Sequence, residues 1–171
     1  MKKVFILLLI LNITTTIGAQ KVTLREIDKF TKCEIIETSV EKLYTKNPMA
    51  MGYSNFFSCG IRKVDGDYSM PATILMDDIV KYDENSGVTF LLSNDETVTL
   101  RTNYTGIGGE KFGQGYLFST SFSLSQSDVD LLRHNDIISI RISYMGGHFD
   151  YDIKGKKQGV VAKMLKLVDE E

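Results

Sequence analysis

The sequence is poor in the residues that would mark a disulfide framework, a metal centre or a nucleic-acid-binding face. Two cysteines and two histidines occur among 171 residues, and neither cysteine has a second ligand residue at zinc spacing. Basic and acidic residues number 20 and 22 and are interspersed, so the composition indicates no basic face for nucleic acid. A Gly-x-Ser-x-Gly nucleophile motif is also absent. Catalysis, metal binding and nucleic-acid binding therefore gain little support from composition.

One long apolar run lies near the N-terminus. Residues 4–11 are apolar, two lysines precede them, and small residues follow. The run is shorter than the roughly 20 apolar residues that a helix needs to cross a bilayer. It is typical of a cleavable secretory signal peptide over residues 1–19. Residues 20–171 would then form a single globular domain without a membrane span, exported to the periplasm or to the cell exterior.

Cys33 and Cys59 are the two cysteines of the chain. In an oxidising compartment they can form a disulfide, which would close a loop of about 26 residues and contribute about 3 kcal/mol in the chain-entropy model. The alternative is two buried free thiols, which pack as small hydrophobic groups. A bridge requires the two Cα atoms to lie within about 7 Å of each other.

Most of the mature chain consists of short runs of β-favouring residues separated by turn residues. The turn residues Asp65-Gly66-Asp67 predict a hairpin with a three-residue loop, which would pair Val64 with Tyr68. The loop is flanked by β-favouring residues on both sides, so this hairpin is expected on local grounds alone.

Residues 87–101 predict a second hairpin. With its turn at Asn94-Asp95, Leu91 would pair with Val98, and Phe90 would lie on the opposite face. Both faces are then partly apolar, so we expect this hairpin to lie centrally in the sheet, covered on two sides.

The clearest hairpin runs from Ile137 to Ile153. With Gly146-Gly147 as its turn, Arg141 pairs with Asp152 on a polar face, and apolar residues pair on the other face. A slip of one residue would break both faces, so the pattern specifies the register strongly.

The polar face of this hairpin carries Arg141, His148, Asp150 and Asp152. Imidazole and carboxylates in one row could hold a divalent cation or act as acid and base. Neighbours on one face of a strand are about 7 Å apart, so a metal would need further ligands. The alternative is the ordinary solvent face of an amphipathic strand, with Asp152 neutralised by Arg141.

Two helices are also predicted. Ser125 resembles an N-cap, and the helix that follows it would end near His134-Asn135. From Lys156 onward, five apolar residues recur at helical spacing: Val160, Val161, Met164, Leu165 and Val168. The sequence therefore predicts an α+β fold, mainly an antiparallel sheet of six to eight strands that could fold over into a sandwich. A short helix would precede the last hairpin, and a C-terminal helix would pack on the sheet.

A glycine-rich segment covers residues 106–115 and predicts a mobile connection before a strand at 116–122. Its spacing fits neither a phosphate-binding loop nor a dinucleotide motif. The flanking side chains Tyr104, Phe112 and Tyr116 could form a surface for a glycan or a peptide, because aromatic rings offer large contact areas. The alternative is burial of at least two of these rings in the core.

Three short motifs follow one another along the chain: Asp28-Lys29-Phe30-Thr31, residues 122–132, and Phe149-Asp150-Tyr151-Asp152-Ile153 before the terminal helix. Their order resembles that of a group of small exported proteins of Gram-negative bacteria. The group has no assigned function, so the resemblance implies export and supplies no catalytic residue.

Together these features predict an exported, non-enzymatic binding or interaction protein of the bacterial envelope, with no cofactor indicated. Its partner would be an envelope protein, a peptide or a glycan, and not a nucleic acid. The alternative is a small secreted hydrolase that uses His148 or a Cys–His pair. A pocket with a histidine near an acid or a thiol would favour the hydrolase, whereas an exposed aromatic patch would favour binding.

Overall fold

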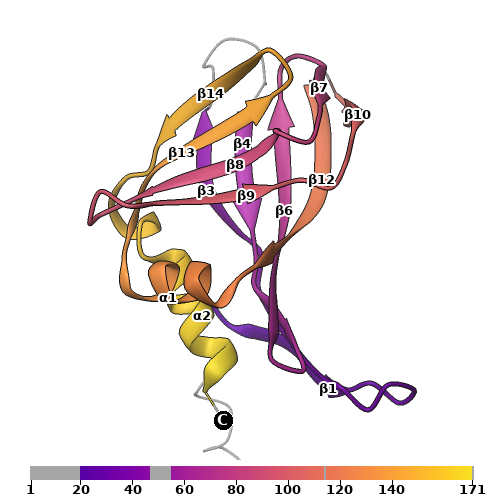
Figure 1. The fold of residues 1–171 in the computed structure, drawn as a ribbon, viewed down its shortest axis with the longest axis vertical. Coiled ribbons are helices and arrows are strands. Elements are labelled where there is room, and N and C mark those ends of the chain that lie inside the picture. The colour runs from indigo at the N-terminus through magenta and orange to yellow at the C-terminus, as the bar shows by residue number, and fades with distance from the viewer. Residues whose placement is uncertain (1–19, 47–54, 114, 171) are drawn as a thin grey trace, which may run out of the picture.

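The protein is an α+β molecule built mainly of antiparallel strands, as the sequence predicts. The computed structural model describes residues 20–46, 55–113 and 115–170; the expected signal peptide lies outside them. Two sheets face each other, and two helices lie at one end of them (Figure 1). The described ranges contain 14 strands, more than the six to eight expected, because several turns divide the larger sheet into short segments.

The larger sheet is centred on its longest strands. It has eight members: β1 (Val22–Ile27), β2 (Glu34–Thr38), β3 (Glu41–Lys46), β4 (Asn55–Cys59), β5 (Arg62–Val64), β6 (Asp67–Met76), β11 (Glu110–Phe112) and β12 (Gly115–Leu124). One edge of β6 pairs with β5 and then with β4, and its other edge pairs with β12 along nearly its whole length. The β1–β2 hairpin projects from the body of the molecule (Figure 1).

The smaller sheet packs against the inner face of the larger one. Its four strands, in spatial order, are β14 (Gly147–Asp152), β13 (Ile137–Tyr144), β8 (Gly87–Leu92) and β9 (Thr97–Arg101). A separate pair is formed by β7 (Val80–Tyr82) and β10 (Gly106–Gly108). Phe90 of β8 meets Phe57 of β4 edge to face, with ring centroids 6.0 Å apart. Both rings are fully buried, so the core lies between the sheets.

Both predicted helices are present. Helix α1 (Gln126–His134) begins at Ser125, whose side chain accepts a hydrogen bond from the Asp128 backbone, while the Asp128 carboxylate accepts one from the Ser125 backbone. This reciprocal capping box explains why the start was readable from sequence. Helix α2 (Val160–Asp169) follows a short 3₁₀ turn, η1 (Gly155–Lys157), and buries all five apolar residues that the spacing predicted. It packs against α1 and β2. Neither helix is long and apolar enough to pass through a bilayer.

All three predicted hairpins form with registers that differ from expectation, because their turns use other residues. Val64 pairs with Asp67 rather than Tyr68, since Asp65 and Gly66 alone form the turn with φ of 50° and 91°. Positive φ at both positions is the pattern of the tight type I′ turn. In the β8–β9 hairpin, Phe90 rather than Leu91 pairs with Val98.

With the observed β8–β9 register, apolar side chains lie on one face of the hairpin and mainly polar side chains on the other. Phe90 and Val98 lie in the core, and the face that carries Thr99 points to solvent. Because β9 is an edge strand of the smaller sheet, the expectation of a hairpin covered on two sides is wrong.

The β13–β14 hairpin has the predicted faces but a register displaced by two residues. Tyr144 pairs with Gly147, so Met145 and Gly146 form the turn, and Gly146 has a φ of 89°. Arg141 therefore pairs with Asp150 rather than with Asp152. A displacement of two residues returns every side chain to its own face, which is why the polar face survives the error.

Candidate functional site at the edge of strand β12

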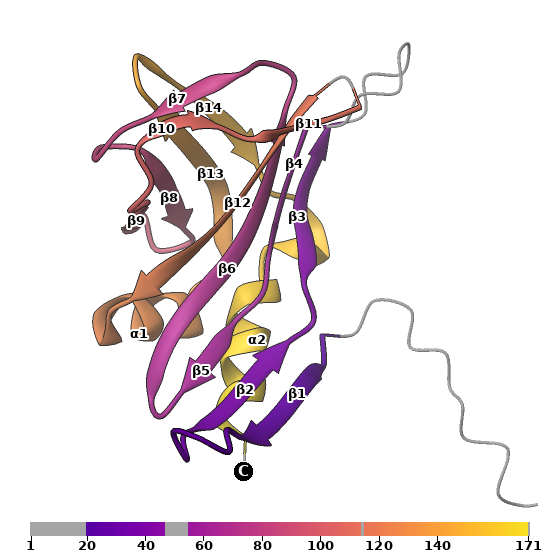
Figure 2. The same cartoon turned by 90° about the vertical axis from the view of Figure 1, so that its right-hand side faces the viewer.

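Strand β12 has an open edge. One side of it pairs with β6 from Tyr116 to Leu124. The other side pairs only with the three residues of β11, up to Leu117. Beyond Leu117 no described strand is hydrogen-bonded to this second edge, although β9 of the smaller sheet contacts β12. Figure 2 shows the strand descending from β11 towards α1.

The position of Pro71 reveals which backbone groups face the open edge. The Pro71 carbonyl accepts a hydrogen bond from the Gly60 amide, at 3.0 Å, on the β4 side of β6. Pro71 lies opposite Ser121 of β12. Because the backbone of Pro71 points towards β4 and away from β12, Pro71 and Ser121 exchange no backbone hydrogen bonds. In such a pair both residues point their N–H and C=O groups outward. Ser121 therefore directs its backbone groups to the open edge, as do Ser119 and Ser123 by strand alternation.

The same alternation explains where β11 attaches. Leu117 belongs to the outward-pointing set and pairs with Glu110 of β11. Before Glu110 the chain leaves this line at Gly109, which has a φ of 99°. A Cβ at Gly109 would lie 3.0 Å from the Tyr116 Cβ and 3.2 Å from the Leu117 carbonyl oxygen, so the departure requires glycine. The residues before Gly109 form β10 and pair with β7 instead.

A shallow, open pocket of about 410 Å³ lies where the chain leaves the edge. It is lined by Tyr104, Ile107, Gly109, Glu110, Leu117, Phe118 and Ser119. We call this pocket, together with the outward backbone groups of Ser119, Ser121 and Ser123, the edge site. Its walls combine apolar and polar groups in nearly equal measure, and through Ser119 it continues into the line of unpaired backbone groups.

The ring of Tyr104 is held in place although it is exposed. Its hydroxyl donates a hydrogen bond to the Ile107 carbonyl at 2.6 Å, and its backbone amide donates one to the Thr102 hydroxyl at 3.1 Å. The ring also packs on Phe118, with centroids 5.5 Å apart. This pocket wall is thus ordered before any partner arrives, which lowers the entropic cost of binding.

Glycine allows the aromatic support behind the pocket to form. Tyr82 stacks on Phe118 with ring centroids 4.2 Å apart and meets Tyr104 edge to face at 6.4 Å. A Cβ on Gly108 would lie only 2.1 Å from a Tyr82 ring carbon. The glycine-rich segment, expected as a mobile connection, therefore contains two short strands, β10 and β11, and Gly108 of β10 admits the Tyr82 ring. Gln114, within the same segment, lies outside the described residues.

The three aromatic residues singled out by sequence have different environments. Tyr104 is 43% exposed and lines the pocket, whereas Phe112 is 61% exposed on β11, outside the pocket lining. Tyr116 is half-buried opposite Lys111. Sequence reasoning missed Ile107, which is 63% exposed, and Phe118, which supports Tyr104. A usable signal was present, because residues 112–127 contain no charge at all.

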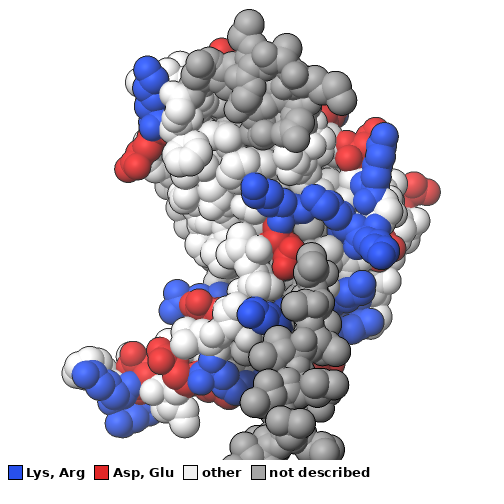
Figure 3. Space-filling view, turned by 180° about the vertical axis from the view of Figure 1, so that it is seen from behind, with Lys and Arg blue, Asp and Glu red and all other residues white. Residues whose placement is uncertain are grey.

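The lack of charge sets β12 apart from the other edge strands. Seen from behind, the outer faces of β4, β6 and β12 form a broad surface with few charged residues (Figure 3). The other long edge strands of the two sheets all carry charges: Arg25 and Glu26 in β1, Glu41 and Lys42 in β3, Arg101 in β9, and Asp150 and Asp152 in β14. Charged side chains on an edge discourage pairing with another chain, and β12 lacks this protection.

The predicted polar face of β13–β14 forms, but its charges neutralise one another. Arg141 donates two hydrogen bonds of 2.7 Å to the Asp150 carboxylate, and these hold the pKa of that carboxyl below its usual range. The His148 Nε2 lies 3.7 Å from Asp150, and both side chains are about half exposed. Asp152 lies opposite Ser139. Within the described ranges no group of three or more candidate ligands gathers for a metal ion.

Neither cysteine is placed for nucleophilic chemistry. Both are free thiols in the structure. Cys59 is fully buried in β4, and burial raises the pKa of its thiol to about 12. Its thiol therefore stays protonated, while His148 lies on the solvent face of β14. Cys33 follows the β1–β2 turn, with its sulfur 3.8 Å from the Thr31 carbonyl oxygen.

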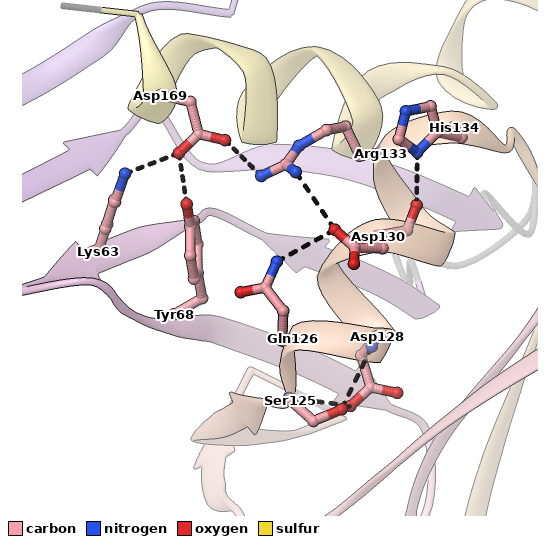
Figure 4. Close-up of polar contacts among 9 residues, drawn as sticks. All are labelled: Lys63, Tyr68, Ser125, Gln126, Asp128, Asp130, Arg133, His134 and Asp169. Atoms are coloured by element: carbon pink, nitrogen blue, oxygen red, sulfur yellow. Dashed lines mark hydrogen bonds and ion pairs between the residues drawn. The ribbon is translucent and has the colours of Figure 1, made fainter.

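The most connected polar cluster joins the two helices to the β5–β6 hairpin (Figure 4). The Asp169 carboxylate of α2 accepts hydrogen bonds from Lys63, at 2.7 Å, from Tyr68 and from Arg133 of α1. Partial burial alone would raise the pKa of Asp169, but the hydrogen bonds from Lys63 and Tyr68 outweigh it and hold the pKa low. The side chains that meet here all come from packed elements, so the cluster fastens the fold. At the end of α1, His134 contacts the Asp130 carbonyl at 2.8 Å, as its position near a helix end predicts.

Comparison with known protein families, with characterised proteins and with solved structures finds no match. The chemistry of the surfaces described above is therefore the basis for a function. Among them, the edge site combines exposed apolar side chains with unpaired backbone groups.

Proposed function

We propose that this chain is an exported, non-enzymatic binding protein of the bacterial envelope, whose partner is another protein bound at the edge site. The observation that carries the proposal is a pocket with two exposed apolar side chains, Tyr104 and Ile107, beside a strand without charge; a third, Phe112, is exposed on the adjoining β11. Exposed apolar groups that cluster on a folded surface mark interaction sites. Export is supported by the signal-like residues 1–19.

Binding explains the side chains better than hydrolysis does. A hydrolase would need an activated nucleophile or a poised acid–base pair in a cleft. The buried Cys59 thiol is protonated, and the Asp150 carboxylate beside His148 is already occupied by Arg141. At the pocket itself, Glu110 is the one titratable carboxylate among the described lining residues.

The lining of the pocket also favours a protein partner over a glycan. A sugar needs several polar side chains around an aromatic platform, because each hydroxyl that loses water must be paired. Here two other lining residues carry polar side chains, Glu110 and Ser119, and the Tyr104 hydroxyl already donates to a backbone carbonyl. An apolar side chain from a polypeptide fits these walls.

Affinity capture from cells tests the proposal. The chain, with a C-terminal tag, is purified from the envelope fraction, and co-purifying proteins are identified by mass spectrometry. We expect a stoichiometric partner that is lost when Ile107 and Phe112 are both changed to serine. The control is Ile27→Ser with Phe30→Ser, which makes the same chemical change on the β1–β2 hairpin at side chains 70% and 82% exposed. Equal loss in both variants, or no partner above background, would overturn the proposal.

A further inference from the structure

We infer that the edge site binds an extended segment of the partner as an added β-strand, antiparallel to β12 and in line with β11. This inference rests on the proposed function and deepens it, because it names the form of the ligand. The bound species is a stretch of about five residues in the β conformation, with an apolar side chain at the end that enters the pocket.

The first support is the number and direction of unpaired backbone groups. Ser119, Ser121 and Ser123 each direct one N–H and one C=O to the open edge, as the Pro71–Gly60 hydrogen bond requires. Neither described strand that pairs with β12 supplies a partner for these groups, because β6 lies on the other edge and the pairing with β11 ends at Leu117. Alternate residues of a strand are roughly 7 Å apart, which is the repeat of an antiparallel ladder. Main-chain pairing of this kind is a common mode of peptide recognition.

The second support is that the chain itself already uses this edge. The pairing of Glu110 with Leu117 places one strand, antiparallel, on the line that a ligand would continue. Gly109 takes the chain away from that line and leaves the next positions vacant. A segment that fills them runs towards β11, so its C-terminal end lies at the pocket beside Ile107 and Leu117.

The third support is the chemistry of the residues along the edge. Besides its sheet partners, β12 is contacted by β9 of the smaller sheet, by β10 and by α1, and the outward positions themselves are serines. The serine side chains at the edge are small and uncharged, so they do not obstruct an approaching backbone.

A phage-displayed library of random 12-residue peptides provides the probe. Peptides selected on the protein are measured by calorimetry, and amide exchange is followed by NMR with and without peptide. We expect the amides of Ser119, Ser121 and Ser123 to become protected on binding, because they gain hydrogen bonds. The amides of Thr120 and Phe122 should change little, because they already pair with β6.

Proline substitution then separates the added strand from the pocket. Ser121→Pro removes an outward N–H without breaking a β6–β12 hydrogen bond, and we expect peptide affinity to fall about tenfold or more. Asp152→Pro is the control, since Ile153 donates to the Ile138 carbonyl of β13 and Asp152 therefore points outward from β14. This variant should bind as the parent does. Circular dichroism establishes that both variants fold.

Each remaining outcome is decisive. If Ser121→Pro binds normally while the Ile107 and Phe112 serine variant does not, the partner uses the pocket alone and strand addition is wrong, although the proposed function stands. If the unsubstituted chain forms a dimer that Ser121→Pro dissolves, a second copy fills the edge and the inference is also wrong. If the library yields no peptide that protects the serine amides, the added strand is excluded.

Discussion

Among the described strands, β12 and β14 each have an edge with outward backbone groups that no strand pairs with, and the side chains along the two edges differ. On β14 the outward backbone groups belong to His148, Asp150 and Asp152, by alternation from the Ile153 hydrogen bond to β13. On β12 they belong to three serines. The backbone pattern is thus the same on both edges, and the side chains at those positions differ in charge.

This difference shows what decides whether a strand edge stays single. An ionised carboxylate would be desolvated by an incoming strand, and this cost opposes pairing. A serine hydroxyl imposes far less cost and still keeps the strand soluble. We therefore expect the charged edge of β14 to resist pairing with another chain and the uncharged edge of β12 to accept it. The predictions below test this contrast.

The largest effect on stability is expected at Gly108, next to the aromatic rings that pack behind the edge site. Gly108→Ala would place a Cβ 2.1 Å from the Tyr82 ring, so the ring must move away from Phe118. We expect the free energy of unfolding, measured in urea, to fall by about 2–3 kcal/mol. Peptide binding should weaken as well, because Tyr82 and Phe118 support the pocket wall formed by Tyr104.

Gly60→Ala is the matched control for this change. A Cβ there would meet its nearest atoms at 3.5 Å, an ordinary contact distance, and we expect a loss below about 1 kcal/mol. Equal urea midpoints for the two variants would show that the Tyr82 ring does not pack on Gly108 in solution.

The next effect acts on stability and leaves the open edge intact. Asp169→Asn weakens the cluster that joins α1, α2 and the β5–β6 hairpin. We expect the free energy of unfolding to fall by about 1–2 kcal/mol at neutral pH, with unchanged peptide affinity. Because the pKa of Asp169 is held low in the folded state, its contribution is present above the ordinary aspartate range. It is lost as the pH falls below about 4 and through the folded pKa.

The parent and the Asp169→Asn variant should therefore converge in stability in acid. Asp130→Asn serves as the control, since Asp130 also pairs with Arg133 but is 55% exposed. It should cost about 0.5 kcal/mol or less. A constant difference between parent and Asp169→Asn from neutral pH to acid would contradict the role of this carboxylate.

The sequence predicted the elements well and their registers poorly, and the two results have different physical causes. The start of α1 was readable because Ser125 and Asp128 satisfy each other's backbone within one turn of helix. The buried face of α2 was readable because a period of 3.6 residues is an intrinsic property of the helix. Such signals involve neighbours in the chain and depend little on the rest of the fold.

Hairpin registers depend on which residues the turn consumes, and turns of two, three or four residues are close in energy. Asp65-Gly66 and Met145-Gly146 both proved to be two-residue turns. The edge site was harder still to foresee. Tyr104 was singled out by its chemistry, but the open edge follows from long-range pairing of β10 with β7, which leaves no local trace.

Charge can be moved onto the open edge to close it. Ser121→Lys places an ammonium group on the β12 edge, and we expect peptide affinity to fall about tenfold while stability changes by less than about 0.5 kcal/mol. The control is Ser69→Lys, on the same sheet face but on the interior strand β6, opposite Ser123. If both lysine variants lose affinity equally, the ligand lies on the sheet face and not along the edge.

The smallest effect comes from the reverse exchange, in which β14 loses its charges. In Asp150→Ser with Asp152→Ser, the exposed Arg141–Asp150 pair is broken, which should cost less than about 1 kcal/mol because water screens it. The folded-state pKa of Asp150 is lowered by Arg141, so even this small contribution is present only above the ordinary aspartate range. Without the two carboxylates, the β14 edge is as free of negative charge as the β12 edge.

We expect this double variant to show weak, concentration-dependent self-association in sedimentation velocity. Glu84→Ser with Asp95→Ser changes the net charge equally in exposed loops and should stay monomeric. If the two double variants sediment alike, charge is not what keeps the β14 edge single, and the absence of charge on β12 would lose its meaning as a sign of an open edge.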